Sequence, residues 1–112
     1  MDDRIKELDP AAVKASLDRD EAILVDVREA NEYEAEYIPG AHLCPLSSFN
    51  PFDLPKVEGK KLILHCASGQ RSLQAGELCL ASGIDEIAHV TGGIQAWREA
   101  GFDTNKGSEA ED

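Results

Sequence analysis

The sequence predicts a single α/β domain built on a parallel sheet, and three observations lead there. Short apolar runs alternate with segments of helical periodicity, which is the pattern of strand–helix–strand units. Residues 22–27 (AILVDV) form a nearly continuous apolar run, which suits a strand covered on both faces in a parallel sheet. The chain has 112 residues and shows no internal repeat or linker, so its size is that of one ordinary domain.

The first two elements are predicted from a helix-start signal. Residues 5–8 can form a short strand, after which Asp9 is placed to cap a helix with Pro10 at its first position. Leu8 and Val13 are spaced to form a hydrophobic staple across this cap. We therefore expect a strand followed directly by a helix.

The rest of the chain continues this alternation. Residues 61–65 give the second strong strand signal and are expected at the centre of the sheet. Residues 47–60 contain two prolines and little periodicity, so we expect a surface excursion with one helical turn. The other expected elements are strands over residues 41–46 and 87–90, helices over residues 29–37 and 72–82, and a last helix between Gly92-Gly93 and Gly101.

The composition is acidic, because 22 Asp and Glu face 11 Lys and Arg and give a formal net charge of −11. Nucleic acid is not an expected partner, since its phosphates would be repelled. A small anionic substrate would meet the same repulsion unless local donors overcame it, and the simplest role of the charge is solubility. Part of the charge lies in residues 107–112, which we expect to be a flexible acidic tail after a domain over residues 1–106.

The three cysteines, Cys44, Cys66 and Cys79, are an odd number without a Cys-x-x-Cys pair, which argues against a disulfide framework and a zinc knuckle. His42 and Cys44 have no further ligands at a known spacing, so neither a metal nor an organic cofactor is expected. The first ten residues lack the apolar core of a secretory signal, and no apolar run approaches the ~18 residues of a membrane span. We expect a soluble, cytoplasmic protein with reduced thiols and no membrane partner.

The loop from Cys66 to Ser72 (CASGQRS) lies between a predicted buried strand and a helix. Parallel α/β sheets place their ligand sites at the carboxyl ends of strands. Gly69 can adopt a positive φ without steric cost, so a loop of small residues can turn several N–H groups toward one point. The following helix contributes the positive end of its dipole, and Arg71 adds a full positive charge. We therefore expect this loop to bind an anion.

These surroundings favour the thiolate form of Cys66. A free cysteine has a pKa of ~8.5, and such an environment lowers it by one to several units. It would equally stabilise a persulfide anion. We predict that Cys66 is the nucleophile and that Arg71 helps to hold an anionic donor. The backbone N–H groups of residues 67–72 are expected to cradle the sulfur, and the further candidate site residues are Ala67, Ser68, Gly69, Gln70 and Ser72, of which Ser68 and Gln70 line the loop.

Four stretches of the chain resemble signatures of the rhodanese family. They are Asp26-Val27-Arg28-Glu29 followed by Glu32-Tyr33, Ile38-Pro39-Gly40-Ala41, the loop from Cys66 to Ser72, and Val90 to Trp97 followed by Gly101. Their order and spacing match the family over residues 5–104. One departure is Glu36-Tyr37, where the family often has Gly-His, so a role of that histidine cannot be transferred to this chain.

The resemblance implies a rhodanese-like sulfurtransferase with a five-stranded parallel sheet and helices on both faces. Cys66 would take sulfane sulfur from a donor such as thiosulfate and release sulfite. The persulfide sulfur would then pass to cyanide in an assay or to a thiol in the cell, in two displacement steps. The expected partners are thus a small-molecule sulfur donor and a thiol or cyanide acceptor, and a protein thiol is a further candidate.

Two alternative functions use the same residues. Phosphatases and arsenate reductases that share the rhodanese fold have a loop resembling Cys-x5-Arg, whereas four residues separate Cys66 from Arg71 here. The shorter loop suits one sulfur atom better than a tetrahedral phosphate. The second alternative is a sulfur carrier or a regulatory binding module without turnover. Inactive members of the family typically lack the cysteine, which this chain retains.

The remaining candidates have structural interpretations. Asp26 and Arg28 lie at the carboxyl end of a predicted strand and are expected to form an ion pair or caps that hold the following helix start. His65 should point to the opposite face from Cys66 and therefore not deprotonate it. Cys79 lies on the apolar side of its helix and is expected in the core. Trp97 is also interpreted as a core residue.

Overall fold

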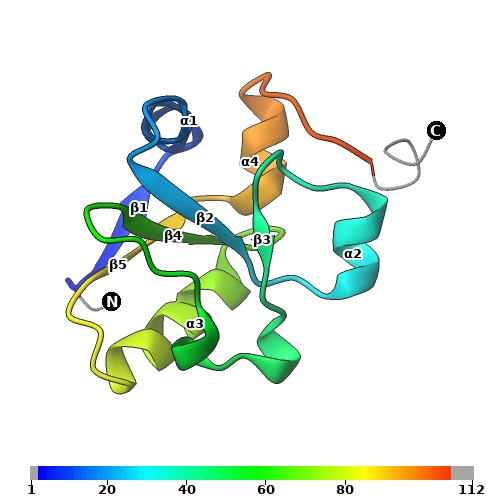
Figure 1. Cartoon of the computed structure of the whole chain (residues 1–112). Helices are drawn as coiled ribbons and strands as arrows, with labels where there is room; N and C mark the ends of the chain where they lie inside the picture. Colours follow the sequence, from blue (N-terminus) through cyan, green and yellow to red (C-terminus); the bar gives the residue numbers. More distant parts are fainter. Residues whose placement is uncertain (1–2, 107–112) are drawn as a thin grey trace.

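The computed structural model describes residues 3–106 as an α/β fold with one sheet (Figure 1). The five strands are all parallel, in the order β1-β5-β4-β2-β3. The predicted tail, residues 107–112, lies outside the described residues. The strands are β1 (Ile5–Leu8), β2 (Ala22–Asp26), β3 (His42–Leu43), β4 (Lys61–His65) and β5 (Ile87–Val90). The helices are α1 (Pro10–Asp18), α2 (Ala30–Ala35), α3 (Gln70–Ala81) and α4 (Gly93–Glu99), with 3-10 turns η1 (Leu46–Ser48) and η2 (Pro51–Asp53).

Helices cover both faces of the sheet, as predicted. Figure 1 shows α1 and α4 on one side and α3 on the other. Successive strand residues face opposite sides, so Leu24 and Ile63 join the core under α1 and α4, whereas Val25 and Leu64 join the core under α3. β4 is the middle strand, and its carboxyl end is therefore enclosed between neighbouring strands. Cys66 is the next residue after β4 and therefore lies at this enclosed strand end.

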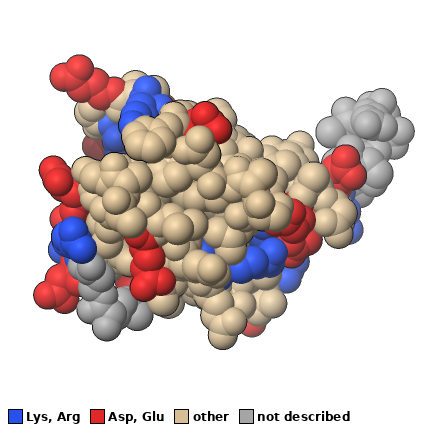
Figure 2. Space-filling view, turned by 90° about the horizontal axis from the view of Figure 1, so that it is seen from below, with Lys and Arg blue, Asp and Glu red and all other residues tan. Residues whose placement is uncertain are grey.

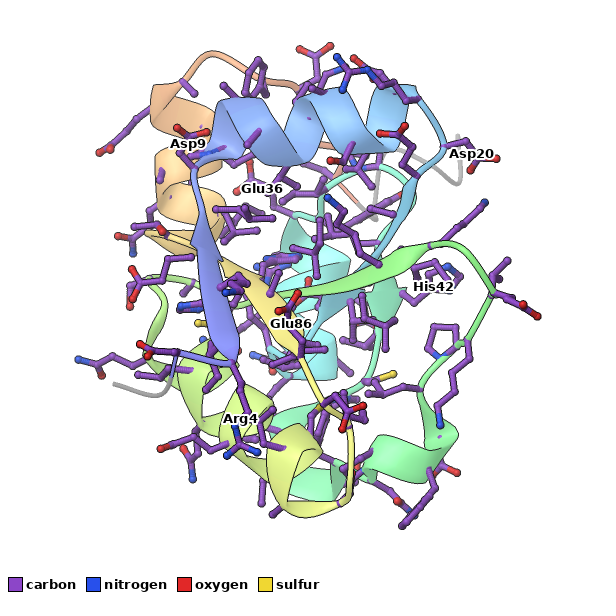
Figure 3. All side chains as sticks on the ribbon, turned by 90° about the vertical axis from the view of Figure 1, so that its left-hand side faces the viewer. Arg4, Asp9, Asp20, Glu36, His42 and Glu86 are labelled. Atoms are coloured by element: carbon purple, nitrogen blue, oxygen red, sulfur yellow. The ribbon has the colours of Figure 1, made fainter. Side chains whose placement is uncertain are left out.

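The start of α1 confirms the predicted cap. The Asp9 side chain accepts a hydrogen bond of 2.8 Å from the Ala12 N–H, and Pro10 is the first helical residue. Figure 3 shows Asp9 where β1 passes into α1. Leu8 and Val13 pack in the same core cluster, as the predicted staple requires. Local sequence therefore determines how this helix begins.

Two predicted elements are shorter in the structure. The helix expected over residues 29–37 ends at Ala35, because Glu36 is extended and Tyr37 exchanges two backbone hydrogen bonds of 2.8 Å with Asn105. Tyr37 still stacks on Tyr33, with the ring centres 4.6 Å apart. The strand expected over residues 41–46 comprises only His42–Leu43. Tertiary pairing rather than local propensity sets the end of α2.

Two other boundaries also differ from the prediction. Residues 47–60 contain parts of two 3-10 turns instead of one helical turn, and Leu54 within them is buried in the core under α3. The helix predicted over residues 72–82 begins two residues earlier, at Gln70. This earlier start matters for the site, since it places Gln70 and Arg71 in the first turn of α3 rather than in the loop.

One face of the molecule has few charged side chains near its centre (Figure 2). Figure 2 views the molecule from the α3 side and shows charged side chains mainly around the edge of a broad uncharged area. The exposed large apolar side chains are Phe52 in η2, Val57 in the following loop and Leu78 in α3.

Within residues 3–106, no helix has both the length and the apolar character needed to cross a bilayer.

Candidate active site

The loop that follows β4 turns sharply at the carboxyl edge of the sheet. Cys66 directly follows the last residue of the middle strand. Gly69 has a φ of 114°, in the left-handed region that favours glycine, and it precedes the first residue of α3. The chain therefore reverses within three residues and directs the amino end of α3 back toward Cys66, as the sequence predicts.

The amino end of α4 supports this loop from behind. The Ile94 N–H donates to the Cys66 carbonyl at 2.9 Å, and the Gln95 N–H donates to the Ala67 carbonyl at 3.2 Å. A Cβ atom at Gly93 would lie 2.4 Å from the Cys66 carbonyl oxygen, so this close approach requires glycine. The sequence assigns Gly93 only the opening of a helix, and its role as the backing of the loop was missed.

The sulfur of Cys66 is surrounded by hydrogen-bond donors. The N–H of Gly69 lies 3.0 Å from Sγ and the N–H of Ser72 lies 3.3 Å away. The Ser72 hydroxyl oxygen, 3.6 Å away, accepts a hydrogen bond from the thiol and can donate one to the thiolate. Burial raises the pKa of Cys66. Hydrogen bonds from the Ser72 side chain and from backbone N–H groups of the loop outweigh this effect, so the pKa lies below its usual value. The arrangement therefore stabilises a negative sulfur.

The predicted loop residues divide into two groups. Gly69 and Ser72 lie at the sulfur, as described above, and the Ser68 N–H also lowers the pKa of Cys66. By contrast, the Ala67 carbonyl binds α4, and the side chains of Ser68 and Gln70 are exposed. Backbone groups therefore form most of the cradle, and the exposed side chains can contact only a ligand arriving from solvent.

Arg71 is held by a residue to which the sequence analysis assigned no role. Its guanidinium donates two hydrogen bonds to the carboxylate of Glu32 in α2, at 2.7 and 2.9 Å. The pair lowers the pKa of Glu32 to about 2, and the hydrogen bonds together with the charge of Glu32 raise the pKa of Arg71. Arg71 therefore lies at the site, but its guanidinium is not free to bind an anion, because both of its terminal nitrogens already bind the Glu32 carboxylate.

Asp26 and Arg28 form a second pair, below the surface. Arg28 donates from Nε and Nη2 to the Asp26 carboxylate at 2.7–3.1 Å, and both side chains are almost completely buried. Arg28 Nη2 also donates to the Glu36 carbonyl at 2.7 Å, just after the end of α2. The predicted ion pair is confirmed. Asp26 Oδ1 also accepts a hydrogen bond of 2.9 Å from the Arg28 N–H, just before α2 begins, so the pair contacts the chain at both ends of this helix.

The hydroxyl of Ser72 makes a further contact below the loop. Its Oγ lies 2.9 Å from Nδ1 of His89, a buried residue of β5. The sequence analysis did not consider His89, and nothing local marks it. The contact arises because β5 lies beside β4 in the sheet, where Leu64 and His89 are in register.

Three further residues behave as predicted. The imidazole of His65 contacts the Cys66 carbonyl at 3.3 Å and Asp26 at 3.5 Å, and neither contact involves the sulfur. Cys79 is fully buried, and burial raises its pKa to about 11, which confirms a core role. Trp97 is likewise buried, with its indole N–H donating to the Asp103 carbonyl at 2.9 Å.

The segment that departs from the family pattern fastens α2 to the end of the domain. The Glu36 carboxylate accepts hydrogen bonds from Arg98 and from the Thr104 hydroxyl, and Tyr37 pairs with Asn105. Glu36 therefore faces the last segment of the chain rather than Cys66. In the described part of the chain, no cluster of three or more His, Cys, Asp or Glu side chains is placed to hold a metal ion.

Comparison with known proteins agrees with this geometry. A model of the rhodanese-like domain matches residues 9–100. An uncharacterized protein of Synechocystis is 41% identical over 97 residues, covering 87% of this chain and 54% of that protein. A thiosulfate sulfurtransferase of Pseudoalteromonas translucida is 27% identical over 84 residues, covering 75% of this chain and 80% of that protein. The chain thus spans about half the length of the Synechocystis relative.

A solved structure gives the same result for the fold. The rhodanese-related protein of Thermoplasma volcanium superposes with a TM-score of 0.78 at 28% identity, covering 89% of this chain and 97% of that one. The family model covers most of the chain, including every element from α1 to α4. The chain therefore belongs to the rhodanese-like domain family.

Proposed function

We propose that this protein is a sulfurtransferase that carries sulfane sulfur as a persulfide on Cys66. The observation that supports this most strongly is the set of donors around Sγ, with the Gly69 and Ser72 N–H groups at 3.0 and 3.3 Å. Such a cradle stabilises the thiolate that attacks the donor and the same thiolate when it leaves in the second step. The match to a thiosulfate sulfurtransferase supports the same chemistry.

The reaction consists of two displacements. In the first, the Cys66 thiolate attacks the outer sulfur of thiosulfate, a new S–S bond forms, and the S–S bond of thiosulfate breaks with its electron pair leaving on sulfite. In the second, cyanide or a thiolate attacks the terminal sulfur, and the Cys66 thiolate leaves with the electron pair of the S–S bond. No net oxidation or reduction of the protein is required.

The Arg71–Glu32 pair and the short loop give phosphatase activity less support than sulfur transfer. A phosphatase needs its arginine directed at the phosphate oxygens, whereas Nη1 and Nη2 of Arg71 both donate to the Glu32 carboxylate. The short loop also leaves the N–H groups on the sulfur itself rather than around a wider ring. We therefore rank the phosphatase and arsenate reductase alternatives below sulfur transfer.

The same pair favours a second candidate function, a carrier that exchanges sulfur with the thiols of partner proteins. The charge of Arg71 is neutralised by Glu32, and the chain has a net charge of −11, so little positive charge remains to offset the repulsion of a dianion such as thiosulfate. Sulfur exchange with a persulfide on a partner protein does not require the charge of Arg71, because the surfaces of the two proteins can hold them together. We further propose that the protein acts in a reducing compartment such as the cytoplasm, where its cysteines stay free.

The proposal is tested by measuring thiocyanate formed from cyanide with thiosulfate as the donor, and separately with a small-molecule persulfide as the donor. Wild-type protein is expected to form thiocyanate with at least one donor, Cys66→Ser with neither, and Cys44→Ser with the same donors as wild type. Activity that survives in Cys66→Ser, or its absence from wild type with both donors, would falsify the proposal.

A further inference from the structure

The hydroxyl of Ser72 has more neighbours than it has hydrogens. Its Oγ lies 3.6 Å from the Cys66 sulfur, 3.1 Å from the Gly69 carbonyl oxygen and 2.9 Å from His89 Nδ1. A serine hydroxyl has one hydrogen to donate and two lone pairs to accept with. Which neighbour receives that hydrogen depends on whether His89 carries a proton on Nδ1.

The surroundings of His89 favour a proton on Nδ1. Within residues 3–106, Nε2 of this ring is buried and has no hydrogen-bond partner. If Nε2 carried the proton, a buried N–H donor would be left unsatisfied, which costs more than an unsatisfied ring acceptor. With the proton on Nδ1, the 2.9 Å contact becomes a hydrogen bond from His89 to Ser72 Oγ.

If His89 Nδ1 donates to Ser72 Oγ, the hydroxyl hydrogen of Ser72 remains available for an acceptor in the loop. The carbonyl of Gly69 can only accept, so in the thiol state Ser72 donates to it. When Cys66 ionises, the hydroxyl can rotate its hydrogen to the sulfur, since its lone pair already receives the His89 proton. A hydrogen bond to a charged acceptor is stronger than one to a neutral carbonyl.

We propose that His89 is a positioning residue that holds the Ser72 hydroxyl as a hydrogen-bond donor to the Cys66 sulfur when that sulfur is negative. His89 acts through Ser72, because its ring lies on β5 and, within residues 3–106, its hydrogen-bond contact is with Ser72 Oγ. The effect on sulfur transfer rests on the proposed function, whereas the effect on the thiolate does not.

The ring is expected to act in its neutral form. Burial lowers the pKa of His89, and Glu7 on the neighbouring strand β1 opposes this effect. The ring contacts the uncharged Ser72 of α3, and Ser72 in turn contacts Cys66 after β4. A neutral donor suffices, because Ser72 needs only to have its lone pair occupied.

The test measures the pH dependence of Cys66 alkylation by iodoacetamide, which requires no sulfurtransferase activity. The background is Cys44→Ser, so that the buried Cys79 is the only other thiol. His89→Leu removes the donor and is expected to raise the apparent pKa of Cys66 by about half to one unit, since this is the size of one hydrogen bond. His89→Asn can place an amide N–H near the position of Nδ1 and is expected to stay within about 0.3 unit of the parent.

Ser72→Ala provides the coupling control. It is expected to raise the pKa of Cys66 at least as far as His89→Leu, and the double variant is expected to go no further than Ser72→Ala alone. The inference is overturned if His89→Leu leaves the pKa unchanged, if His89→Asn shifts it as far as His89→Leu, or if the two substitutions are additive.

A measurement on the unmutated protein guards against variants that do not fold. Long-range proton–nitrogen correlation NMR of the histidine rings distinguishes the two neutral tautomers. A proton on Nδ1 of His89 supports the inference, and a proton on Nε2 overturns it. If these results hold but no sulfur is transferred, the proposed function fails while the role of His89 in stabilising the thiolate stands.

Discussion

Two carboxylate–arginine pairs lie near Cys66, and they differ mainly in depth. In the Asp26–Arg28 pair, the side chains are 0% and 5% exposed. In the Glu32–Arg71 pair, they are 30% and 32% exposed. Both arginines bind their partners with two nitrogens. The comparison therefore separates the effect of burial from the effect of the chemical groups themselves.

Burial gives the two pairs different functions. Separating a buried pair leaves an unsolvated charge, so Asp26 and Arg28 must remain together whenever the protein is folded. Water can replace part of a half-exposed pair at low cost, so the Glu32–Arg71 pair can open to admit an anion. We therefore expect the inner Asp26–Arg28 pair to fix the scaffold and the outer Glu32–Arg71 pair to control access to the positive charge of Arg71.

The largest expected effect comes from removing one member of the inner pair. Arg28→Leu leaves the Asp26 carboxylate buried without its partner and should destabilise the protein by about 3–5 kcal/mol, measured by urea unfolding. As a control, Lys14→Ala in the exposed Lys14–Asp18 pair should cost less than about 1 kcal/mol. If the two substitutions lower the free energy of unfolding equally, burial does not distinguish the two kinds of pair.

The second effect concerns Arg71 and should appear in catalysis rather than in folding. Arg71→Leu removes the charge expected to hold an anionic donor, so kcat/KM for thiosulfate should fall about tenfold, equivalent to one charge-assisted hydrogen bond. The unfolding free energy should change by less than about 1 kcal/mol. A large loss of stability with unchanged KM would assign Arg71 a structural role instead.

Replacing Glu32 should have a smaller effect on kcat/KM for thiosulfate, and this effect should be a gain instead of a loss. Glu32→Gln weakens the hold on Arg71 and should raise kcat/KM for thiosulfate about threefold, because the guanidinium becomes available to the donor. A sulfane donor without charge should show no such gain. The matched control is Glu34→Gln, an exposed residue on the same helix. If both variants behave alike, the gain reflects net charge rather than release of Arg71.

The smallest effect is the pH dependence of the outer pair. Arg71 lowers the pKa of Glu32 from 4.5 to about 2 in the folded protein, so its ionisation stabilises the fold above the unfolded pKa of 4.5. This contribution is lost as the pH falls from 4.5 toward about 2. Because the pair is half-exposed, we expect about 1 kcal/mol or less. Urea unfolding should show wild type more stable than Glu32→Gln at pH 6, with a smaller difference at pH 3.

The sequence predicted the parts of the fold that depend on local signals. The Asp9 cap, the apolar run over residues 22–27 and the turn at Gly69 are determined by residues close to one another in the chain. The ends of α2 and β3 were not predicted correctly. The end of α2 depends on the pairing of Tyr37 with Asn105, far away in the sequence.

The same division applies to the site. The loop from Cys66 to Ser72 and its cradle follow from local chain geometry. Glu32 lies 39 residues from Arg71 in the sequence, and His89 lies 17 residues from Ser72. Both contacts depend on which elements become neighbours, β5 beside β4 and α2 near the start of α3. A single sequence does not contain that information in a form that spacing reveals.

The most direct test of the central claim is the intact mass of the protein before and after incubation with a sulfane donor, followed by cyanide. We expect wild type to gain the mass of one sulfur atom, peptide mapping to locate it on Cys66, and cyanide to remove it. Cys66→Ser should gain nothing. A stable gain on Cys44 or Cys79 with Cys66 unmodified, or no gain with either thiosulfate or a persulfide donor, would contradict the assignment of Cys66 as the sulfur carrier.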